Sequence, residues 1–284
     1  MPLSCYHAVK RTGADARPPP AASYINAVFV GDRSGSMRSM GSVPQEGVAR
    51  FLQNHKDLAD KNPDSVIHVT VVTFDTHSEV AYSGYAKDIT SNHIDDAMSS
   101  MIPRNTTRLI DTAIEELEKQ AKSIVIAKNR FQNPKTSSRL SVEARRLEPT
   151  MASSFTLLTD GDDNESRFTT LDLNKAIRKH QDTHNTVCLF AAANQDAMST
   201  GASYGFRQDR SLQIGNDVDD ARAAFDSCNA AAVRSATGQD AQYTACEREA
   251  SCTMDFHDYG DYSSMILDYD VNSVNCPVPR ATRY

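Results

Sequence analysis

Short, almost uninterrupted apolar runs alternate along this chain with longer stretches in which apolar residues recur three and four positions apart. The clearest run is Ile25 to Val30, which ends at Gly31-Asp32, and the next, Val66 to Phe74, is rich in β-branched residues. Continuous apolar runs of this length are typical of strands buried on both faces of a sheet. The predicted strands span residues 25–30, 66–74, 79–82 (at an edge), 155–159, 186–193 and 212–214.

Amphipathic stretches follow most of these strands. In residues 43–58, for example, Val48, Phe51 and Leu52 share one face of a helix because they lie three and four positions apart. The predicted helices span residues 43–58, 89–101, 107–126, 171–184, 196–202 and 217–236. Strands that alternate with helices indicate βαβ crossovers, so we predict an α/β fold with a mostly parallel sheet between layers of helices.

The pattern predicts one main domain, residues 24–237, with additions. Residues 1–23 are polar and proline-rich, and we expect a flexible N-terminal arm there. Residues 128–150 are polar and basic and are predicted to be an insertion, in which 141–147 is the one candidate for a short helix. Residues 238–284 are predicted to be a C-terminal extension that packs on the domain through its aromatic side chains.

Composition narrows the range of functions. The chain has 30 Lys and Arg against 37 Asp and Glu, a net charge of -7, which argues against a nonspecific hold on nucleic acid or acidic membranes. It has no apolar run of about 20 residues, so we expect no membrane span. Because the first residues lack the apolar core of a secretion signal, we expect a cytoplasmic protein.

The six cysteines form no CxxC pair, which argues against a zinc ribbon. Cys188 falls inside an apolar run and is predicted to be a buried thiol. We expect reduced thiols, and the alternative is a disulfide among Cys246, Cys252 and Cys276 in an oxidising compartment.

Candidate chemistry lies where two of the predicted strands end. Asp32 follows the first strand and Asp160 follows the strand at 155–159, so in parallel neighbours both carboxylates would emerge at one edge of the sheet. Hydroxyls follow Asp32 at intervals of two, at Ser34 and Ser36. Oxygen donors without histidine or cysteine suit Mg²⁺, or Mn²⁺ in its place, and disfavour zinc.

Three motifs together resemble the von Willebrand factor type A domain and its metal-ion-dependent adhesion site. They are Asp32-x-Ser34-x-Ser36, Thr107-x-Leu109-x-Asp111 and Leu158-Thr159-Asp160-Gly161. The resemblance spans about residues 25–236 and implies a Rossmann-like sheet with amphipathic helices on both faces.

By this resemblance, the metal ligands would be the hydroxyls of Ser34, Ser36 and Thr107, with Asp32 and Asp160 acting directly or through water. Thr106 is the alternative to Thr107, which we prefer because the rest of its motif follows at the family's spacing. The family often places a glycine pair before this threonine, where the present chain has Arg104-Asn105.

Other polar residues follow the same strands. We interpret them as solvated loop residues and not as ligands, with a role in shaping a partner surface as the alternative. They are Asp162, Asp163, Asn164, Gln195 and Asp196.

The resemblance implies a non-enzymatic, adhesion-type module in which bound Mg²⁺, or Mn²⁺ or Ca²⁺, accepts a Glu or Asp carboxylate from a protein partner. Ser36 has no assigned base, so we predict no catalytic residue. The alternatives are a subunit or scaffold of a larger complex, as in chelatases or copine-like proteins, a nucleic-acid-associated role, and a metal-dependent hydrolase. The sequence predicts no oligomeric state.

Overall fold

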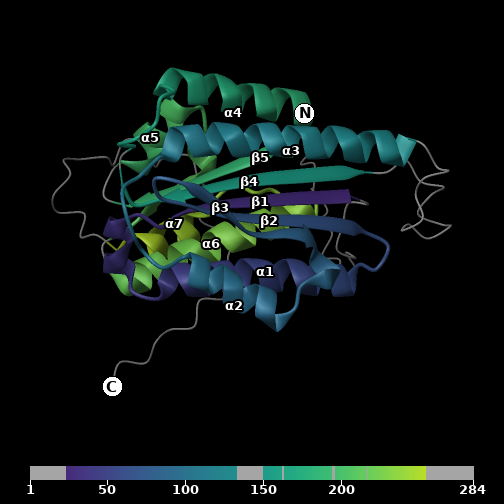
Figure 1. Ribbon diagram of the computed structural model, residues 1–284, viewed down its shortest axis with the longest axis horizontal. Helices are drawn as coiled ribbons and strands as arrows, with labels where there is room; N and C mark the ends of the chain where they lie inside the picture. Colours follow the sequence, from purple (N-terminus) through teal and green to yellow (C-terminus); the bar gives the residue numbers. More distant parts are fainter. Residues whose placement is uncertain (1–23, 133–149, 162, 194–195, 216, 254–284) are drawn as a thin grey trace, which may run out of the picture.

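A six-stranded sheet runs through the middle of the molecule, and helices cover both of its faces (Figure 1). The computed structural model describes residues 24–132, 150–161, 163–193, 196–215 and 217–253. The strand order is β3-β2-β1-β4-β5-β6, and every neighbouring pair is parallel except β2 and β3. The strands are β1 Tyr24–Asp32, β2 Val66–Phe74, β3 Ser78–Tyr85, β4 Met151–Thr159, β5 Val187–Ala193 and β6 Ser211–Ile214. The predicted α/β architecture is confirmed.

Helices α3, α4 and α5 cover one face of the sheet, and α1, α2 and α6 cover the other (Figure 1). The helices are α1 Val43–Lys61, α2 Ser91–Ser100, α3 Leu109–Gln132, α4 Thr170–His184, α5 Ala197–Tyr204, α6 Val218–Ala236 and α7 Ala245–Ser251. Short 3₁₀ turns are η1 Gly35–Met40, η2 Ala86–Asp88 and η4 Gln208–Arg210. Each face thus buries its own layer of apolar side chains.

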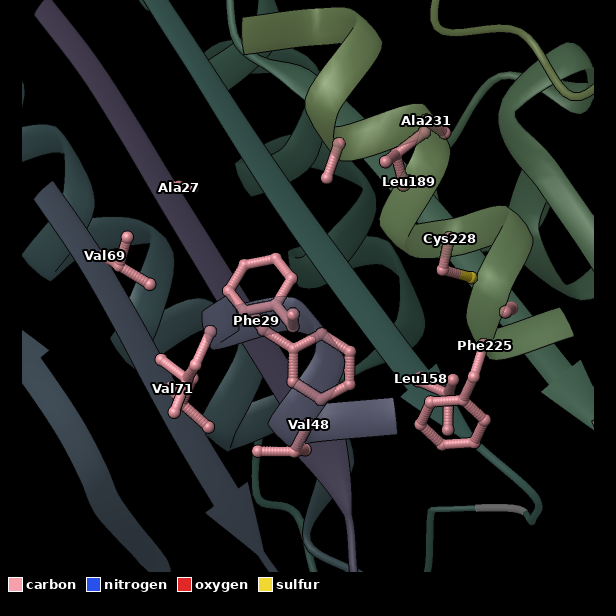
Figure 2. Close-up of a cluster of buried hydrophobic side chains, with 14 of the residues drawn as sticks. Ala27, Phe29, Val48, Val69, Val71, Leu158, Leu189, Phe225, Cys228 and Ala231 are labelled. Atoms are coloured by element: carbon pink, nitrogen blue, oxygen red, sulfur yellow. The ribbon is translucent and has the colours of Figure 1, made fainter. Parts of the chain in front are cut away.

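The central strand β1 is buried along its whole length and serves both layers. Ile25 and Phe29 lie in the core under α1 and α6, whereas Val28 and Val30 lie in the core under α3. This division follows from the alternation of side chains along a strand. Figure 2 shows Phe29 in the first of these cores, where its ring centroid lies 6.4 Å from that of Phe225 on α6. The buried face on each side holds β1, and hence its carboxyl end, in a fixed position.

Two boundaries and one helix differ from the expectations in ways that the contacts explain. Helix α3 continues to Gln132, so residues 128–132 are helical, because lysine and arginine are good helix formers on an exposed face. Strand β4 begins at Met151, four residues before the apolar run, because Ser153 and Ser154 are buried with hydrogen-bond partners. Helix α7 was not expected, although Thr244 and Glu247 form a capping box that marks its start.

Several expectations fall outside the described residues. The arm at 1–23, the candidate helix at 141–147 and the tail from 254 onward belong to this group, as do Cys5 and Cys276. Within the described part, α7 packs against α6 and β6. The described cysteines are free, and Cys188 is buried as expected. No helix in this part of the chain is long and apolar enough to cross a bilayer.

Candidate metal site

The two strand-terminal aspartates lie on neighbouring strands at the same edge of the sheet. β1 and β4 pair in parallel, with Gly31 opposite Leu158, so Asp32 and Asp160 both emerge at the carboxyl edge. Both are buried. The predicted juxtaposition of these carboxylates therefore follows from the pairing of β1 with β4.

Asp32 is held in place by the first turn after its own strand and by β4. Its Oδ1 accepts a hydrogen bond of 2.6 Å from the main-chain N–H of Ser34, and its Oδ2 accepts one of 2.7 Å from the Thr159 hydroxyl. Thr159 was expected only as part of the Asp160 motif, and the structure shows that its side chain orients Asp32.

Both serine hydroxyls of the first motif face Asp160. The Ser36 hydroxyl donates to Asp160 Oδ1 at 2.8 Å, and the Ser34 hydroxyl lies 3.0 Å from that of Ser36 and 3.5 Å from the same carboxylate oxygen. Asp32, Ser34, Ser36 and Asp160 therefore form one cluster of oxygen atoms.

Thr107 lies on a loop that is hydrogen-bonded both to the loop after Asp160 and to the loop that carries the two serines. Its carbonyl accepts hydrogen bonds from the main-chain N–H groups of Asn164 and Glu165, at 2.9 and 3.1 Å, in the loop after Asp160. Its hydroxyl makes no hydrogen bond with the four clustered residues, all of which the structure describes. Thr107 is buried, whereas Thr106 is exposed and donates to Glu165. This difference favours Thr107 as the inward-facing residue.

Asn105 explains how the loop forms without the glycine pair of the resemblance. Its φ is 59°, in the left-handed region that asparagine tolerates better than most non-glycine residues. In that conformation its carbonyl accepts a 3.0 Å hydrogen bond from the N–H of Gly35. The Thr107 loop is thereby joined to the loop that carries Ser34 and Ser36.

No family model matches this sequence, and no curated protein matches it. Solved structures are similar in fold. Proximal thread matrix protein 1 from the mussel byssus is 18% identical, with a TM-score of 0.43, over 73% of this chain and 45% of that one. A von Willebrand factor type A protein from Catenulispora acidiphila is 16% identical, with a TM-score of 0.44, over 74% of this chain and 43% of that one.

The pilus adhesin SpaC from Lactobacillus rhamnosus GG is 12% identical, with a TM-score of 0.49, over 75% of this chain and 31% of that one. The present chain thus spans less than half the length of these proteins. Its mostly parallel sheet, its helices on both faces and the position of the two aspartates at one edge agree with the expectations from the sequence. The fold is α/β and Rossmann-like, with a mostly parallel sheet between two layers of helices.

Burial sets the electrostatics of the site. Burial, together with the smaller effect of the charge of Asp160, raises the pKa of the Asp32 carboxyl to about 6, against the hydrogen bonds from Thr159 and Ser34 that lower it. Burial also raises the pKa of Asp160. Two buried carboxylates side by side are costly unless a cation compensates them.

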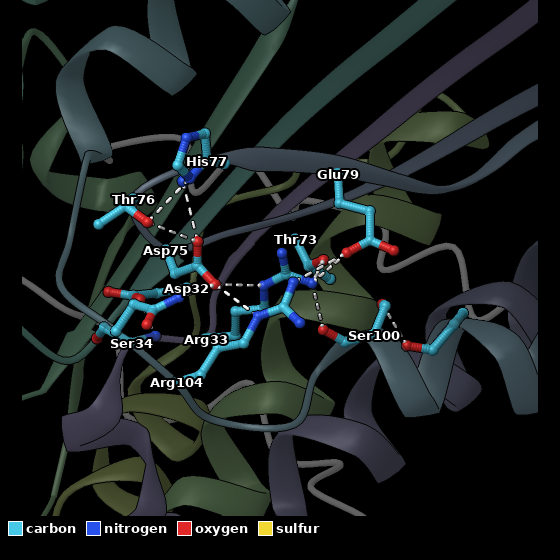
Figure 3. Close-up of polar contacts among 12 residues, drawn as sticks. Asp32, Arg33, Ser34, Thr73, Asp75, Thr76, His77, Glu79, Ser100 and Arg104 are labelled. Atoms are coloured by element: carbon cyan, nitrogen blue, oxygen red, sulfur yellow. Dashed lines mark hydrogen bonds and ion pairs between the residues drawn. The ribbon is translucent and has the colours of Figure 1, made fainter.

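The donor set fits a hard divalent cation. It consists of carboxylate and hydroxyl oxygens, and the one basic side chain of the motif, Arg33, points away toward Asp75 (Figure 3). Across the described residues, no three histidine, cysteine, aspartate or glutamate side chains are grouped to hold a metal ion. A cation at this edge would therefore need the hydroxyls as ligands beside the carboxylates.

The loop after Asp160 corrects one expectation. Asp163 is not a merely solvated residue, because its Oδ1 accepts hydrogen bonds from the main-chain N–H groups of Leu109 and Ile110, at 2.8 and 3.2 Å. It therefore caps the N-terminus of α3, where free N–H groups need acceptors. Asp111, from the Thr107 motif, accepts from the main-chain N–H groups of Arg167 and Phe168 in return. These bonds fix the Thr107 loop beside Asp160.

The remaining loop residues have local roles or lie outside the described part. Asp196 is exposed and caps α5 through Oδ1, which accepts from the N–H groups of Met198 and Ser199. Asn164 is exposed. Asp162 and Gln195 belong to the residues that the structure does not describe.

Proposed function

We propose that this chain is a non-enzymatic protein-binding module that holds a divalent cation at the carboxyl edge of its sheet and uses it to bind an acidic side chain of a partner. The observation that supports this function is the cluster of Asp32, Ser34, Ser36 and Asp160. Both serine hydroxyls lie within 3.5 Å of Asp160 Oδ1, and Asp32 Oδ1 accepts from the main-chain N–H of Ser34. Thr107 completes the proposed ligand set.

The chemistry of the donors favours Mg²⁺, with Mn²⁺ or Ca²⁺ as substitutes. Two carboxylates and neutral hydroxyls would leave one coordination position of an octahedral ion open, and a hard oxygen anion suits that position. A Glu or Asp carboxylate of a partner would supply that ligand. Mussel proximal thread matrix protein 1 has been solved with a zinc-occupied MIDAS motif, so zinc belongs among the metals to be compared.

A thermal-shift titration tests metal binding. The wild type and Asp32→Ala are titrated with Mg²⁺, Mn²⁺, Ca²⁺ and Zn²⁺, with Asp64→Asn as the control, because Asp64 is exposed before β2 at the opposite edge of the sheet. A metal at 100 times its Kd stabilises the native state by about 2.7 kcal/mol. We expect this stabilisation in the wild type and the control only. An equal response of Asp32→Ala and the wild type would overturn the metal site.

Partner recognition needs a separate test. The wild type is immobilised and a library of peptides containing Asp or Glu is compared with the matched library containing Asn or Gln, in Mg²⁺ and in EDTA. We expect retention only of acidic peptides and only with Mg²⁺. Retention that ignores either the acid or the metal would contradict the proposed mode of binding.

A further inference from the structure

The arginine inside the metal-binding motif is buried on the side away from the two carboxylates. Arg33 stands between Asp32 and Ser34, and its side chain is 2% exposed. A guanidinium removed from water must be compensated by charged or hydrogen-bonding partners. The partners of Arg33 therefore show what this position of the motif requires.

Arg33 joins three elements that surround the site (Figure 3). Its Nε donates to Asp75 Oδ2 at 3.2 Å, after β2, and its Nη1 donates to Glu79 Oε2 at 2.6 Å, on β3. Nη1 also donates to the Thr73 hydroxyl at 3.1 Å and to the Ser100 carbonyl, at the end of α2, at 2.9 Å.

A second arginine, next to the Thr107 motif, binds the same two carboxylates. Arg104 Nε donates to Asp75 Oδ2 at 2.8 Å, and its Nη2 donates to Glu79 Oε2 at 3.2 Å. Asn105 Nδ2 also donates to Asp75 Oδ2, at 3.3 Å. Asp75 therefore receives one donor from the first ligand-bearing loop and two from the second.

Main-chain hydrogen bonds follow the same connections. The N–H of Arg33 donates to the Phe74 carbonyl at 2.8 Å, and the N–H of Arg104 donates to the Arg33 carbonyl at 2.7 Å. The N–H of Arg108 donates to the Asp75 carbonyl at 2.9 Å. Main-chain and side-chain hydrogen bonds thus fix the positions of both ligand-bearing loops relative to the end of β2.

We propose that Arg33, Asp75 and Arg104 form a positioning network that sets the distance between the Ser34–Ser36 loop and the Thr107 loop, and thereby the metal affinity of the site. This inference rests on the proposed metal binding. Together with Glu79, which pairs with both arginines, the network adds no net charge beside the ligands. Its effect on the metal is positional, since none of its members is a proposed ligand.

Asp75→Asn tests the network, because it removes the shared charge with little change of shape. Mg²⁺ affinity is measured by calorimetry and the free energy of unfolding is measured separately in EDTA. Partners that orient metal ligands typically contribute 10–100-fold to affinity, so we expect Mg²⁺ to bind at least about 10-fold more weakly. Arg104→Lys keeps the positive charge but cannot donate to Asp75 and Glu79 from two separate nitrogen atoms. We expect it to weaken Mg²⁺ binding less than Asp75→Asn does.

Arg234→Lys is the matched control. Arg234 pairs with Glu247 at 2.8 and 3.0 Å and joins α6 to α7, away from the ligand loops. It should lower the free energy of unfolding without changing Mg²⁺ affinity, which separates positioning from general stability.

The outcomes divide clearly. Wild-type Mg²⁺ affinity in Asp75→Asn would overturn the network and leave the proposed function intact, whereas a wild type that binds no divalent metal would overturn both. If Asp75→Asn does not fold, Arg104→Lys and Arg104→Ala decide, since the Arg104 side chain is 54% exposed. Unchanged affinity in both would then overturn the network.

Discussion

Two buried polar clusters of this molecule differ in how their polar groups are compensated. Under α3, Gln120 donates to Asn26 Oδ1 at 3.1 Å and to the Ser154 carbonyl at 2.8 Å, and its own Oε1 lies 2.9 Å from His180 Nε2. Burial, with His184 nearby, lowers the pKa of His180 to about 4, so this cluster is neutral. At the carboxyl edge, by contrast, Asp32 and Asp160 are both acids with raised pKa values.

The difference shows how a buried polar cluster with a structural role can be distinguished from one that binds a ligand. Neutral groups that satisfy one another need nothing from outside the chain. Two neighbouring carboxylates cannot satisfy one another, and the nearest buried guanidinium, that of Arg33, is engaged by Asp75 and Glu79. The carboxyl edge therefore favours a cation, whereas the Gln120 cluster serves to join α3 and α4 to the sheet.

The largest effect is expected for Asp160→Asn. The amide oxygen can still accept from Ser36, but one of the two charges for the cation is lost. We expect Mg²⁺ to bind more than about 100-fold more weakly in calorimetry, because even indirect partners of ligands contribute up to about that factor. The free energy of unfolding in EDTA should not fall, because the substitution removes the repulsion between the two carboxylates. Mg²⁺ affinity equal to that of the wild type would contradict the assignment of the carboxyl-edge cluster as a cation site.

The opposite pattern is expected for Gln120→Met. The thioether fills a similar volume but leaves His180, Asn26 and the Ser154 carbonyl without their partner. We expect a loss of roughly 3 kcal/mol in the free energy of unfolding, measured with denaturant, because each buried group left unsatisfied costs about 1–3 kcal/mol. Mg²⁺ affinity should not change. A marked loss of affinity would show that the Gln120 cluster is not independent of the edge.

The pH dependence of stability should have opposite signs in the two clusters. Asp32 has a folded pKa of about 6 against a reference of 3.8, so in EDTA its contribution is present below pH 3.8 and lost as pH rises through about 6. His180, at about 4 against 6.5, contributes above pH 6.5 and loses this contribution as pH falls through about 4.

Urea unfolding of Asp32→Asn and His180→Gln between pH 4 and 7 checks this pair. The stability of the wild type relative to Asp32→Asn should fall as pH rises, and relative to His180→Gln it should increase. Slopes of equal sign would contradict the assignment of charge in one of the clusters.

The smallest effect is expected for Asp196→Ala. This residue follows β5 at the same edge but only caps α5, so its loss should cost about 1 kcal/mol in thermal unfolding. Mg²⁺ affinity should match that of the wild type. A reduced affinity would extend the proposed site to the loop after β5.

The sequence predicted the strands best where both faces are apolar. The bounds of β2 agree with the run 66–74, whereas β4 begins earlier because Ser153 is buried through a hydrogen bond to Thr186, which a hydrophobic pattern does not register. The end of α3 was missed because residues 128–132 contain a single apolar residue, Phe131, which is too few to form a periodic pattern.

The cluster of Asp32, Ser34, Ser36 and Asp160 could be predicted because parallel neighbours bring their carboxyl ends together. The hydrogen-bond partners that position the surrounding loops could not be predicted. Arg33 meets Asp75 only because β2 pairs with β1, and Asp163 caps α3 only because the loop after β4 folds back. Such contacts depend on tertiary structure and leave no periodic signal in the chain.

The central claim is that a divalent cation binds among Asp32, Ser34, Ser36, Thr107 and Asp160. Paramagnetic broadening of amide NMR signals by Mn²⁺ tests it most directly, because the effect falls steeply with distance from the ion. We predict that the Gly35 and Gly161 signals disappear at substoichiometric Mn²⁺ and return with excess Mg²⁺, while that of Ser65, before β2 at the opposite edge, persists. Broadening at Ser65 with sharp Gly35 and Gly161 signals would contradict the account.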